Sequence, residues 1–338
     1  MVMQMNRLTG PSVKLMSGLI LLLCLSTADT VAQEKHKMTM ADVERQIAEL
    51  SNWGRWGDND QKGAINLITP QKRIDAAQQV KLGICVSLAR LAEETRAVDN
   101  PDPFIQRMLV IGQEVGNPFA ADRYNVAYHG YAHTHMDALC HLFHRGRLYN
   151  GYTHDAVTKD GANKLSIHSQ QQGVFTRGVL IDVPRMRKLD YLEPKTAIFP
   201  EDLDAWEQAT GIRVSAGDVV FIRTGRWARR DALGPWDVQK DGLAGLHGSC
   251  AQWLRKRDIA MLGSDAASDV LPSQVDGITH PVHLLMLHSM GVQIFDNCDL
   301  EDLGRVTAKL NRWEFLLTAS PIPVQGGTGS PLNPIATF

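Results

Sequence analysis

Residues 129–144 read His129-Gly-Tyr-Ala-His-Thr-His-Met-Asp-Ala-Leu-Cys-His-Leu-Phe-His144, and they hold five of the 12 histidines in the chain. Within this stretch His135 and Asp137 are two residues apart, so on an extended strand both side chains would leave the same face. His141 follows four residues after Asp137, a spacing that brings two side chains together where the chain turns or becomes helical. A strand that ends near Asp137 and then turns would therefore bring His135, Asp137 and His141 to one point.

The imidazole and carboxylate groups of this stretch are ligand types that suit zinc or manganese. A catalytic site uses only two or three protein ligands, and the open position then holds a water whose pKa falls to about 7. The alternative is a buried network of hydrogen-bonded histidines and aspartates without a metal. Because residues that can act as ligands are so dense here, we predict a divalent metal, Zn or Mn, as cofactor.

Short apolar runs elsewhere in the chain predict buried strands. They are Ile84 to Leu88, Val179 to Val183, Val219 to Ile222, Ile259 to Leu262, and Val292 to Phe295. Helix-start residues between and before these runs predict helices after Thr39, from Pro70 to Leu82, from Pro200, and from Ser249 to Arg257. Strands mixed with helices in this way predict an α/β or α+β fold with a mixed sheet.

The N-terminus has the pattern of a secretory signal peptide. Arg7 and Lys14 form a basic region, an apolar run spans Leu15 to Leu25, and a site of small residues follows. We predict that residues 1–32 are a signal peptide and that the mature chain is periplasmic or secreted, with no membrane contact after cleavage. A lipid anchor at Cys24 is the alternative, which is disfavoured because a large residue precedes that cysteine.

The composition of the 338-residue chain excludes some classes of protein. Its formal net charge is −2, which excludes a nucleic-acid binder that works through bulk positive charge and leaves a small-molecule substrate as the expected partner. No linker-like segment divides residues 33–338, so we expect a single domain. Cys85, Cys140, Cys250 and Cys298 have no zinc-finger or redox spacing, and we expect small buried side chains, although an exported chain could also pair them.

The motif Thr134-His135-Met-Asp137-x-x-x-His141 resembles the Thr-His-x-Asp-x-x-x-His core of the cyclase family, which includes bacterial kynurenine formamidases and isatin hydrolases. Other similar segments are Trp56-Gly-Asp, Gly63-Ala-Ile-Asn-Leu67, Arg177-Gly-Val-Leu-Ile-Asp182, Gly217-Asp-Val-Val, Thr224-Gly, and the tail Gly326-Gly-Thr-Gly-Ser-Pro331, which on its own reads as a turn. Together they resemble a longer, secreted branch of the family. The resemblance covers nearly all of residues 50–338 and implies a metal-dependent hydrolase with a swivelling β/β/α cyclase-like fold, usually as a homo-oligomer.

The resemblance also implies roles for individual residues. By position, His135 and Asp137 are metal ligands and His141 is the catalytic general acid/base. His283, in Pro281-Val-His-Leu-Leu, resembles a second ligand segment, and Asp296 stands where those enzymes have Glu.

One position departs from the family pattern. Kynurenine formamidases carry another ligand histidine four residues before His135, and this chain has Tyr131 there. Either Tyr131 is a weak ligand or none, or His129 or His133 takes its place. The number of metal ions depends on which of these holds.

Three further residues are candidates for substrate binding. Trp56 and Phe143 could form an aromatic wall for a planar substrate, the alternative being that they are ordinary buried aromatics. His247 lies between glycines before a predicted helix, where it could face a cleft.

Together these features predict a metal-dependent hydrolase that opens an amide, imide or lactone bond of a small substrate through activated water. A serine hydrolase is disfavoured because the chain has no Gly-x-Ser-x-Gly motif. The alternatives are a periplasmic metal-binding or small-molecule-binding protein without turnover, and a ring-closing cyclase. An open coordination position beside a proton-transferring histidine would distinguish an enzyme from a binding protein.

Overall fold

The computed structural model describes residues 35–113 and 116–338. Met38–Phe338 forms one compact unit, which is described here. The predicted signal peptide, residues 1–32, and the alternative lipid site at Cys24 lie outside the described residues. Within the described ranges, no helix is both long enough and apolar enough to cross a membrane.

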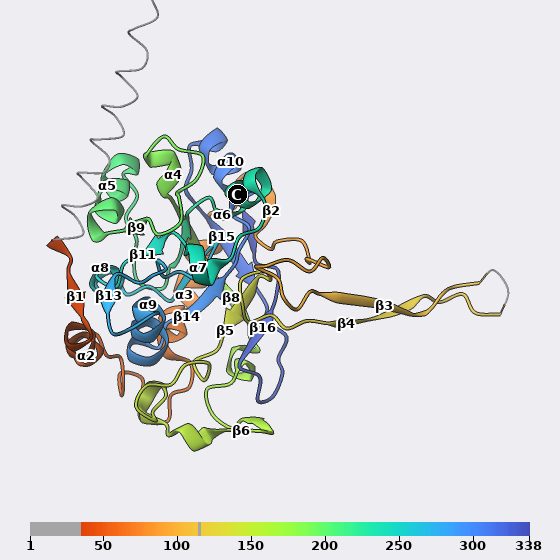
Figure 1. Cartoon of the computed structure of the whole chain (residues 1–338), viewed down its shortest axis with the longest axis horizontal. Coiled ribbons are helices and arrows are strands. Elements are labelled where there is room, and N and C mark those ends of the chain that lie inside the picture. The colour runs from red at the N-terminus through yellow and green to blue at the C-terminus, as the bar shows by residue number, and fades with distance from the viewer. Residues whose placement is uncertain (1–34, 114–115) are drawn as a thin grey trace, which may run out of the picture. The chain divides into compact units, whose positions relative to one another are not determined.

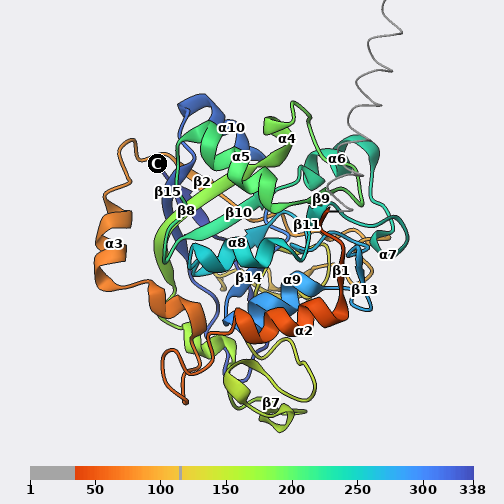
Figure 2. The ribbon, with the colours of Figure 1, turned by 90° about the vertical axis from the view of Figure 1, so that its left-hand side faces the viewer.

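A nine-stranded mixed sheet forms the centre of the unit (Figures 1 and 2). In spatial order its strands are β16 (Gly329–Pro331), β5 (His135–Asp137), β14 (Gln293–Asp296), β12 (Met261–Ser264), β10 (Val219–Arg223), β8 (Val174–Asp182), β15 (Glu314–Ala319), β17 (Ile335–Thr337) and β2 (Cys85–Ser87). The four middle strands, β14, β12, β10 and β8, run parallel, and those on either side pair antiparallel. The predicted fold class, α/β (α+β) with a mixed sheet, is confirmed.

Helices cover the sheet, and α5, α8 and α9 lie over one of its faces (Figure 2). The helices are α2 (Met40–Glu49), α3 (Pro70–Ala77), α4 (Val183–Met186), α5 (Pro200–Thr210), α6 (Arg226–Leu233), α7 (Val238–Asp241), α8 (Cys250–Lys256), α9 (Pro281–His283) and α10 (Glu301–Leu310). Short 3-10 helices are η1 (Gly63–Leu67), η2 (Tyr149–Gly151), η3 (His154–Ala156) and η4 (Ile167–Gln170), and the π-helix η5 (Leu284–Met290) follows α9 directly.

Four small two-stranded sheets complete the unit. They are β1 (Met38–Thr39) with β13 (Val275–Asp276), β9 (Ala197–Ile198) with β11 (Gly245–Leu246), β3 (Ile105–Val110) with β4 (Ala121–Asn125), and β6 (Val157–Thr158) with β7 (Gly161–Ala162). The β3–β4 hairpin projects away from the other elements (Figure 1).

The helix-start residues act as the sequence predicts. At α2, the Asp42 amide donates to the Thr39 hydroxyl and the Thr39 amide donates to the Asp42 carboxylate, a reciprocal cap. The predicted end of α3 at Leu82 is wrong, because the helix ends at Ala77. The amides of Leu82 and Gly83 instead donate to the carbonyl of Phe338, so pairing with the C-terminus ends the helix early.

Two other expectations need correction. Cys140, Cys250 and Cys298 are buried free thiols, as expected, but Cys85 is exposed because it faces outward on β2 at the end of the sheet. The tail predicted to be a turn begins with one at Gln325 and Gly326, but its last three residues form strand β16, which pairs with β5. It pairs because β5 has an edge that β14 leaves free.

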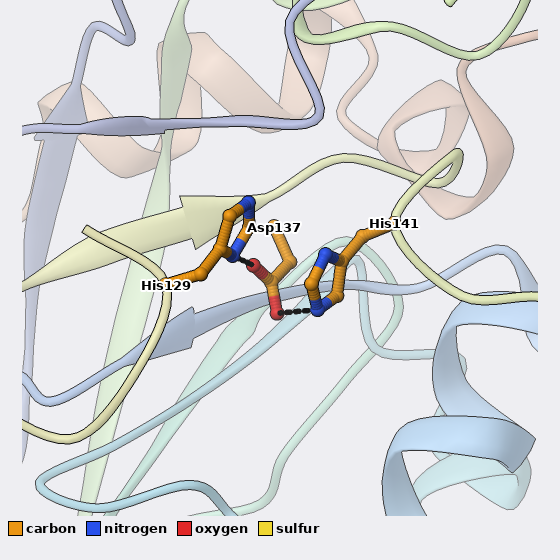
Figure 3. Close-up of side chains that lie close together, drawn as sticks. All are labelled: His129, Asp137 and His141. Atoms are coloured by element: carbon orange, nitrogen blue, oxygen red, sulfur yellow. Dashed lines mark ion pairs between the residues drawn. The ribbon is translucent and has the colours of Figure 1, made fainter. Parts of the chain in front are cut away.

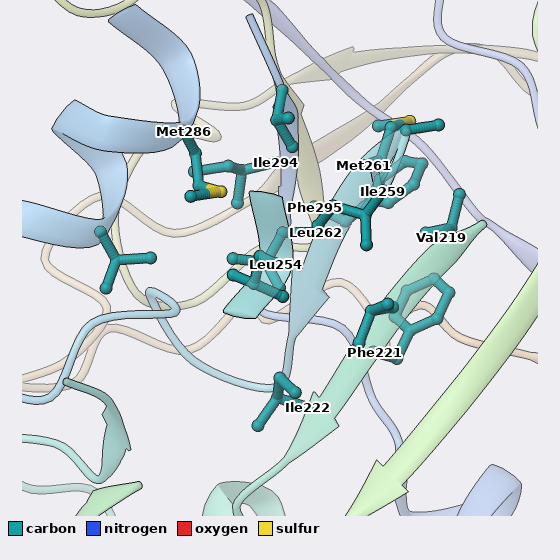
Figure 4. Close-up of a cluster of buried hydrophobic side chains, with 14 of the residues drawn as sticks. Val219, Phe221, Ile222, Leu254, Ile259, Met261, Leu262, Met286, Ile294 and Phe295 are labelled. Atoms are coloured by element: carbon teal, nitrogen blue, oxygen red, sulfur yellow. The ribbon is translucent and has the colours of Figure 1, made fainter. Parts of the chain in front are cut away.

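The core is formed by apolar side chains between the sheet and the helices (Figure 4). The Phe221 ring of β10 stacks on Phe295 of β14, with ring centroids 5.9 Å apart. Gly263 of β12 lies directly opposite Phe221 in the strand register. A Cβ atom at Gly263 would lie 2.5 Å from the Phe221 ring, so the missing side chain makes room for this aromatic packing.

Replacing Gly263 with alanine should therefore destabilise the fold by overpacking, at a cost of about 1–3 kcal/mol. Urea unfolding followed by circular dichroism would measure the loss. Gly112→Ala is the matched control, because its Cβ would be 3.5 Å from the nearest atom. Equal stability of the two variants would contradict this account of the core.

Candidate metal centre

Strand β5 places His135 and Asp137 on one face, as their spacing predicts. Nε2 of His135 lies 3.4 Å from Oδ1 of Asp137, and both side chains are almost fully buried. Nδ1 of His135 is 2.9 Å from the carbonyl oxygen of His133, a hydrogen bond that leaves Nε2 directed at the carboxylate. The backbone of this strand is paired on both sides, by β14 and β16, which fixes the position of both groups.

A turn after β5 brings His141 to the same carboxylate. The His141 amide donates to the carbonyl of Ala138, and Nε2 of His141 lies 3.9 Å from Oδ2 of Asp137 (Figure 3). The His141 side chain keeps about a third of its surface exposed, unlike His135. The structure thus brings together the three residues of the central motif.

The second predicted segment reaches this point from the other end of the chain. Asp296 ends β14 directly opposite His135, and its Oδ2 lies 3.2 Å from Nε2 of His283. Nε2 of His283 is also 3.9 Å from Oδ2 of Asp137. Behind His283, Asp269 holds the ring: its carboxylate is 2.6 Å from Nδ1 and accepts the backbone amide of the same residue.

In the structure His129, and not Tyr131, lies beside the Asp137 carboxylate. Nδ1 of His129 lies 3.1 Å from Oδ1 of Asp137, and its ring stacks on that of His141 with centroids 4.1 Å apart (Figure 3). The Tyr131 hydroxyl instead accepts a hydrogen bond from Gln239. Nε2 of His129 lies 3.0 Å from the Thr328 hydroxyl, in the tail that the sequence predicts to be a turn.

These residues fit a divalent cation. Oδ1 of Asp137, Oδ1 of Asp296 and Nδ1 of His129 are buried without a hydrogen-bond partner, although each belongs to the cluster. Separations of 3.1 to 3.4 Å between neighbouring ligand atoms match tetrahedral ligands at metal bonds of about 2.0 Å. The His135, Asp137 and Asp296 atoms lie within 4.8 Å of one another, as do those of His129, Asp137 and His141.

The electrostatics of the cluster favour an ionised Asp137 and a neutral His141. Burial alone would raise the pKa of Asp137, but His141, His129 and His135 hold it well below its ordinary value. Burial opposes protonation of His283, yet the Asp296 and Asp269 carboxylates raise its pKa well above the ordinary value. Burial lowers the pKa of His141, which outweighs the effect of Asp137 and favours the neutral ring.

Comparison with known proteins agrees with this arrangement. The family model for cyclases matches residues 74–269, more than half of the chain. The chain belongs to the cyclase family. A crystal structure described as a novel cyclase is 30% identical, with a TM-score of 0.76, and the match covers 85% of this chain and 99% of that one.

Isatin hydrolases share the fold of this cyclase-family chain. Isatin hydrolase A from Labrenzia aggregata is 20% identical with a TM-score of 0.54, covering 77% of this chain and 94% of that one. The enzyme of the same name from Ralstonia solanacearum is 20% identical with a TM-score of 0.53, and the match covers 79% of this chain and 97% of that one. No protein with a curated description matches the sequence.

A cavity of about 310 Å³ lies next to the cluster of this cyclase-family chain. His129, Tyr131 and His133 form part of its lining, as do Val98 and Asp102. Among the described residues that line it, none is lysine or arginine. Its size suits a small substrate, and its lining favours one without negative charge.

The three predicted substrate contacts have other neighbours in the structure. Trp56 packs against the main core beneath the Arg55 guanidinium. Phe143 is 42% exposed. His247 is buried beside Phe199, with Nδ1 2.9 Å from the Ser249 hydroxyl. Their roles in substrate binding stay predictions.

Replacing His129 with alanine should weaken metal binding in this cyclase-family chain. The loss should exceed the roughly 10- to 100-fold that an outer-shell partner costs, because His129 offers an unpartnered nitrogen to the cluster. Titration of the chelator-treated protein with Zn²⁺ would measure it. Tyr131→Phe is the control and should bind as the parent does; the reverse ranking would make Tyr131 the ligand.

Proposed function

We propose that this protein is a metal-dependent hydrolase that opens an amide, imide or lactone bond of a small substrate without negative charge. Membership of the cyclase family and a fold shared with isatin hydrolase support hydrolysis. The observation that carries the proposal is the partly exposed His141, with its Nε2 3.9 Å from the buried Asp137 carboxylate. A partly exposed imidazole beside the candidate metal site can exchange a proton with a bound substrate, which is what hydrolysis requires.

In this proposal each side chain of the cluster has a role. His129, His135 and Asp137 would hold a divalent ion, with His283 and Asp296 available from the facing strand and helix. Such an ion, Zn or Mn, lowers the pKa of a coordinated water toward about 7 and polarises a carbonyl group. The site would hold two ions if His283 and Asp296 bind a second one, and one ion if they do not.

His141 is the group that moves the proton. Its imidazole is neutral near neutral pH because burial lowers its pKa, so it can accept a proton from water. The same nitrogen can then return the proton to the leaving nitrogen or oxygen. Asp137, held ionised by the surrounding histidines, lies 3.9 Å from the His141 ring, which stacks on the ring of His129.

Asp269 positions His283. It accepts the backbone amides of Val282 and His283 and the ring Nδ1 proton, which fixes Nε2 toward Asp296 and Asp137. Carboxylate–histidine pairs of this kind set ring orientation at metal sites. No spacing in the sequence links Asp269 to the motif, and only the fold brings it to His283.

One experiment tests the function. Metal is removed from the purified protein with a chelator, Zn or Mn is restored, and hydrolysis of an aryl formamide, a cyclic imide and a lactone is followed. We expect turnover of at least one substrate, lost without metal and recovered with it. Stoichiometric metal without turnover of any of the three would favour the binding-protein alternative, and condensation in place of hydrolysis would favour a ring-closing cyclase.

We propose further that the mature chain acts in the periplasm or outside the cell. The basic region, the apolar run and the small-residue site of residues 1–32 support export. N-terminal sequencing of exported protein should find a start near Gln33. A retained leader, or a lipid on Cys24, would contradict this proposal.

A further inference from the structure

Residues 129–134, here called the ligand loop, carry His129 beside the Asp137 carboxylate and His133 in the wall of the cavity (Figure 3). All residues of the loop are described, and none of them lies in a helix or a strand. Directly after His129 comes Gly130, whose φ of 142° lies in the region that favours glycine. Regular backbone pairing therefore does not hold the position of His129, and other contacts must fix it.

Asn297 supplies such contacts from a distant part of the chain. It directly follows Asp296, the last residue of β14, and its side chain is fully buried. Its Nδ2 donates to the carbonyl oxygen of Gly130 at 2.7 Å and to that of His133 at 3.2 Å. Its own carbonyl oxygen accepts the Thr134 hydroxyl at 2.7 Å. One residue thus holds the ligand loop near its start and at its end.

Asn297 is itself held in place by Arg226, whose side chain is also buried. Nη1 of Arg226 donates to Oδ1 of Asn297 at 2.7 Å, and Nη2 donates to the carbonyl oxygen of Tyr131 in the loop. Because Oδ1 accepts from the guanidinium, the donor end of the Asn297 amide faces the loop carbonyls. The backbone amide of Asn297 donates to the carbonyl of Ala266 at 3.0 Å, which fixes the other end of the residue.

The carbonyl oxygen of His133 links Asn297 to the metal cluster. The same oxygen lies 2.9 Å from Nδ1 of His135, the hydrogen bond that leaves Nε2 of His135 directed at Asp137. Asn297 therefore holds the acceptor that orients the His135 ring. Partners that orient a ligand histidine in this way affect how tightly a metal is bound.

We propose that Asn297 is a positioning residue of the candidate metal centre. It holds the ligand loop so that His129 and His135 keep their nitrogens at the Asp137 carboxylate. It acts through the carbonyl groups of the loop and is not itself a ligand. This inference rests on the metal-binding part of the proposed function, and the alternative is that Asn297 only stabilises the fold.

The test compares Asn297→Gly with a matched control, Asn150→Gly. Asn297 and Asn150 have φ values of 54° and 58°, which glycine adopts readily, so each change removes a side-chain amide without straining the backbone. Nδ2 of Asn150 also donates to two loop carbonyls, those of Gly57 and Asp58, and neither residue belongs to the cluster or lines its cavity.

Chelator-treated parent and variants are titrated with Zn²⁺, and the visible spectrum of bound Co²⁺, which reports the geometry of its ligands, is recorded. Asn297→Gly should weaken Zn²⁺ binding by about 10- to 100-fold and change the Co²⁺ spectrum. Asn150→Gly should match the parent in both measurements. Thermal unfolding of each variant gives its loss of stability, which a purely structural role would change without changing the metal readouts.

Asn297→Asp is a second variant, because a carboxylate still accepts from Arg226 but cannot donate to the loop carbonyls. It should bind Zn²⁺ more weakly than the parent despite its added negative charge. Folded variants that bind Zn²⁺ as the parent does, with an unchanged Co²⁺ spectrum, would overturn the proposal. Loss of folding in both variants would also overturn it and make Asn297 a structural residue.

The parent protein separates this inference from the proposed function. A parent that binds none of Zn²⁺, Mn²⁺ and Co²⁺ would overturn the metal-dependent function and this inference with it. A parent that binds metal, beside Asn297 variants that bind it equally well, would overturn the role of Asn297 alone.

Discussion

His141→Ala is expected to lower kcat by about 10²- to 10⁴-fold while the protein keeps most of its metal. Loss of general acid/base help costs this factor, which corresponds to about 3 to 5 kcal/mol of barrier. The His141 ring is partly exposed and lies 3.9 Å from Asp137, whereas the His135 ring is buried. Exposure lets His141 reach a substrate and move a proton, which the buried His135 ring cannot do. Substrate binding should change little, since the proton moves only during reaction.

Elemental analysis and steady-state kinetics on the same preparation separate the two roles of a histidine. His154→Ala is the control, because His154 is an exposed residue of η3 and its loss should leave both quantities unchanged. A metal-free His141→Ala protein would identify His141 as a metal ligand. The proton carrier would then have to be sought among His129, His133 and His247.

His135→Ala and Asp137→Ala should each empty the metal site and abolish activity. Both side chains are almost fully buried and aimed at each other, so each offers the cluster a ligand atom in a fixed position. Asp137 is the more severe loss, because its two oxygens face His129, His135, His141 and His283. The expected result is metal below the detection limit of elemental analysis, with a native circular dichroism spectrum.

Asp137→Asn is the conservative companion to these variants. It keeps the shape of the side chain and removes its charge, so it should also lose metal if charge is what holds the ion. Stoichiometric metal in both His135→Ala and Asp137→Ala would refute the ligand assignment. If Asp137→Ala unfolds the protein, the circular dichroism spectrum will show it. The metal content of Asp137→Asn then tests the ligand assignment instead.

Several features of the site could be predicted from local spacing. The two-residue separation of His135 and Asp137 places both on one face of any strand, and β5 has this form. The four-residue separation to His141 needs a turn, which the Ala138 carbonyl provides by accepting the His141 amide. The helix starts at Thr39 and Thr69 likewise depend only on nearby donors and acceptors.

Other features depend on which distant segments the fold brings together. The choice of His129 over Tyr131 or His133 is one example, because no local rule says which side chain of a loop turns toward Asp137. The early end of α3 is another, because it depends on the C-terminal residue Phe338.

The sequence by itself determined the fold class, the family resemblance and the central motif, because each rests on residues that are close along the chain. The tertiary structure alone decided that Asp296 faces His135, that Asp269 holds His283, and that Thr328 reaches His129. Side-chain direction within an element follows from backbone geometry. Contact between elements follows from strand order and register, which are fixed by packing of the whole core.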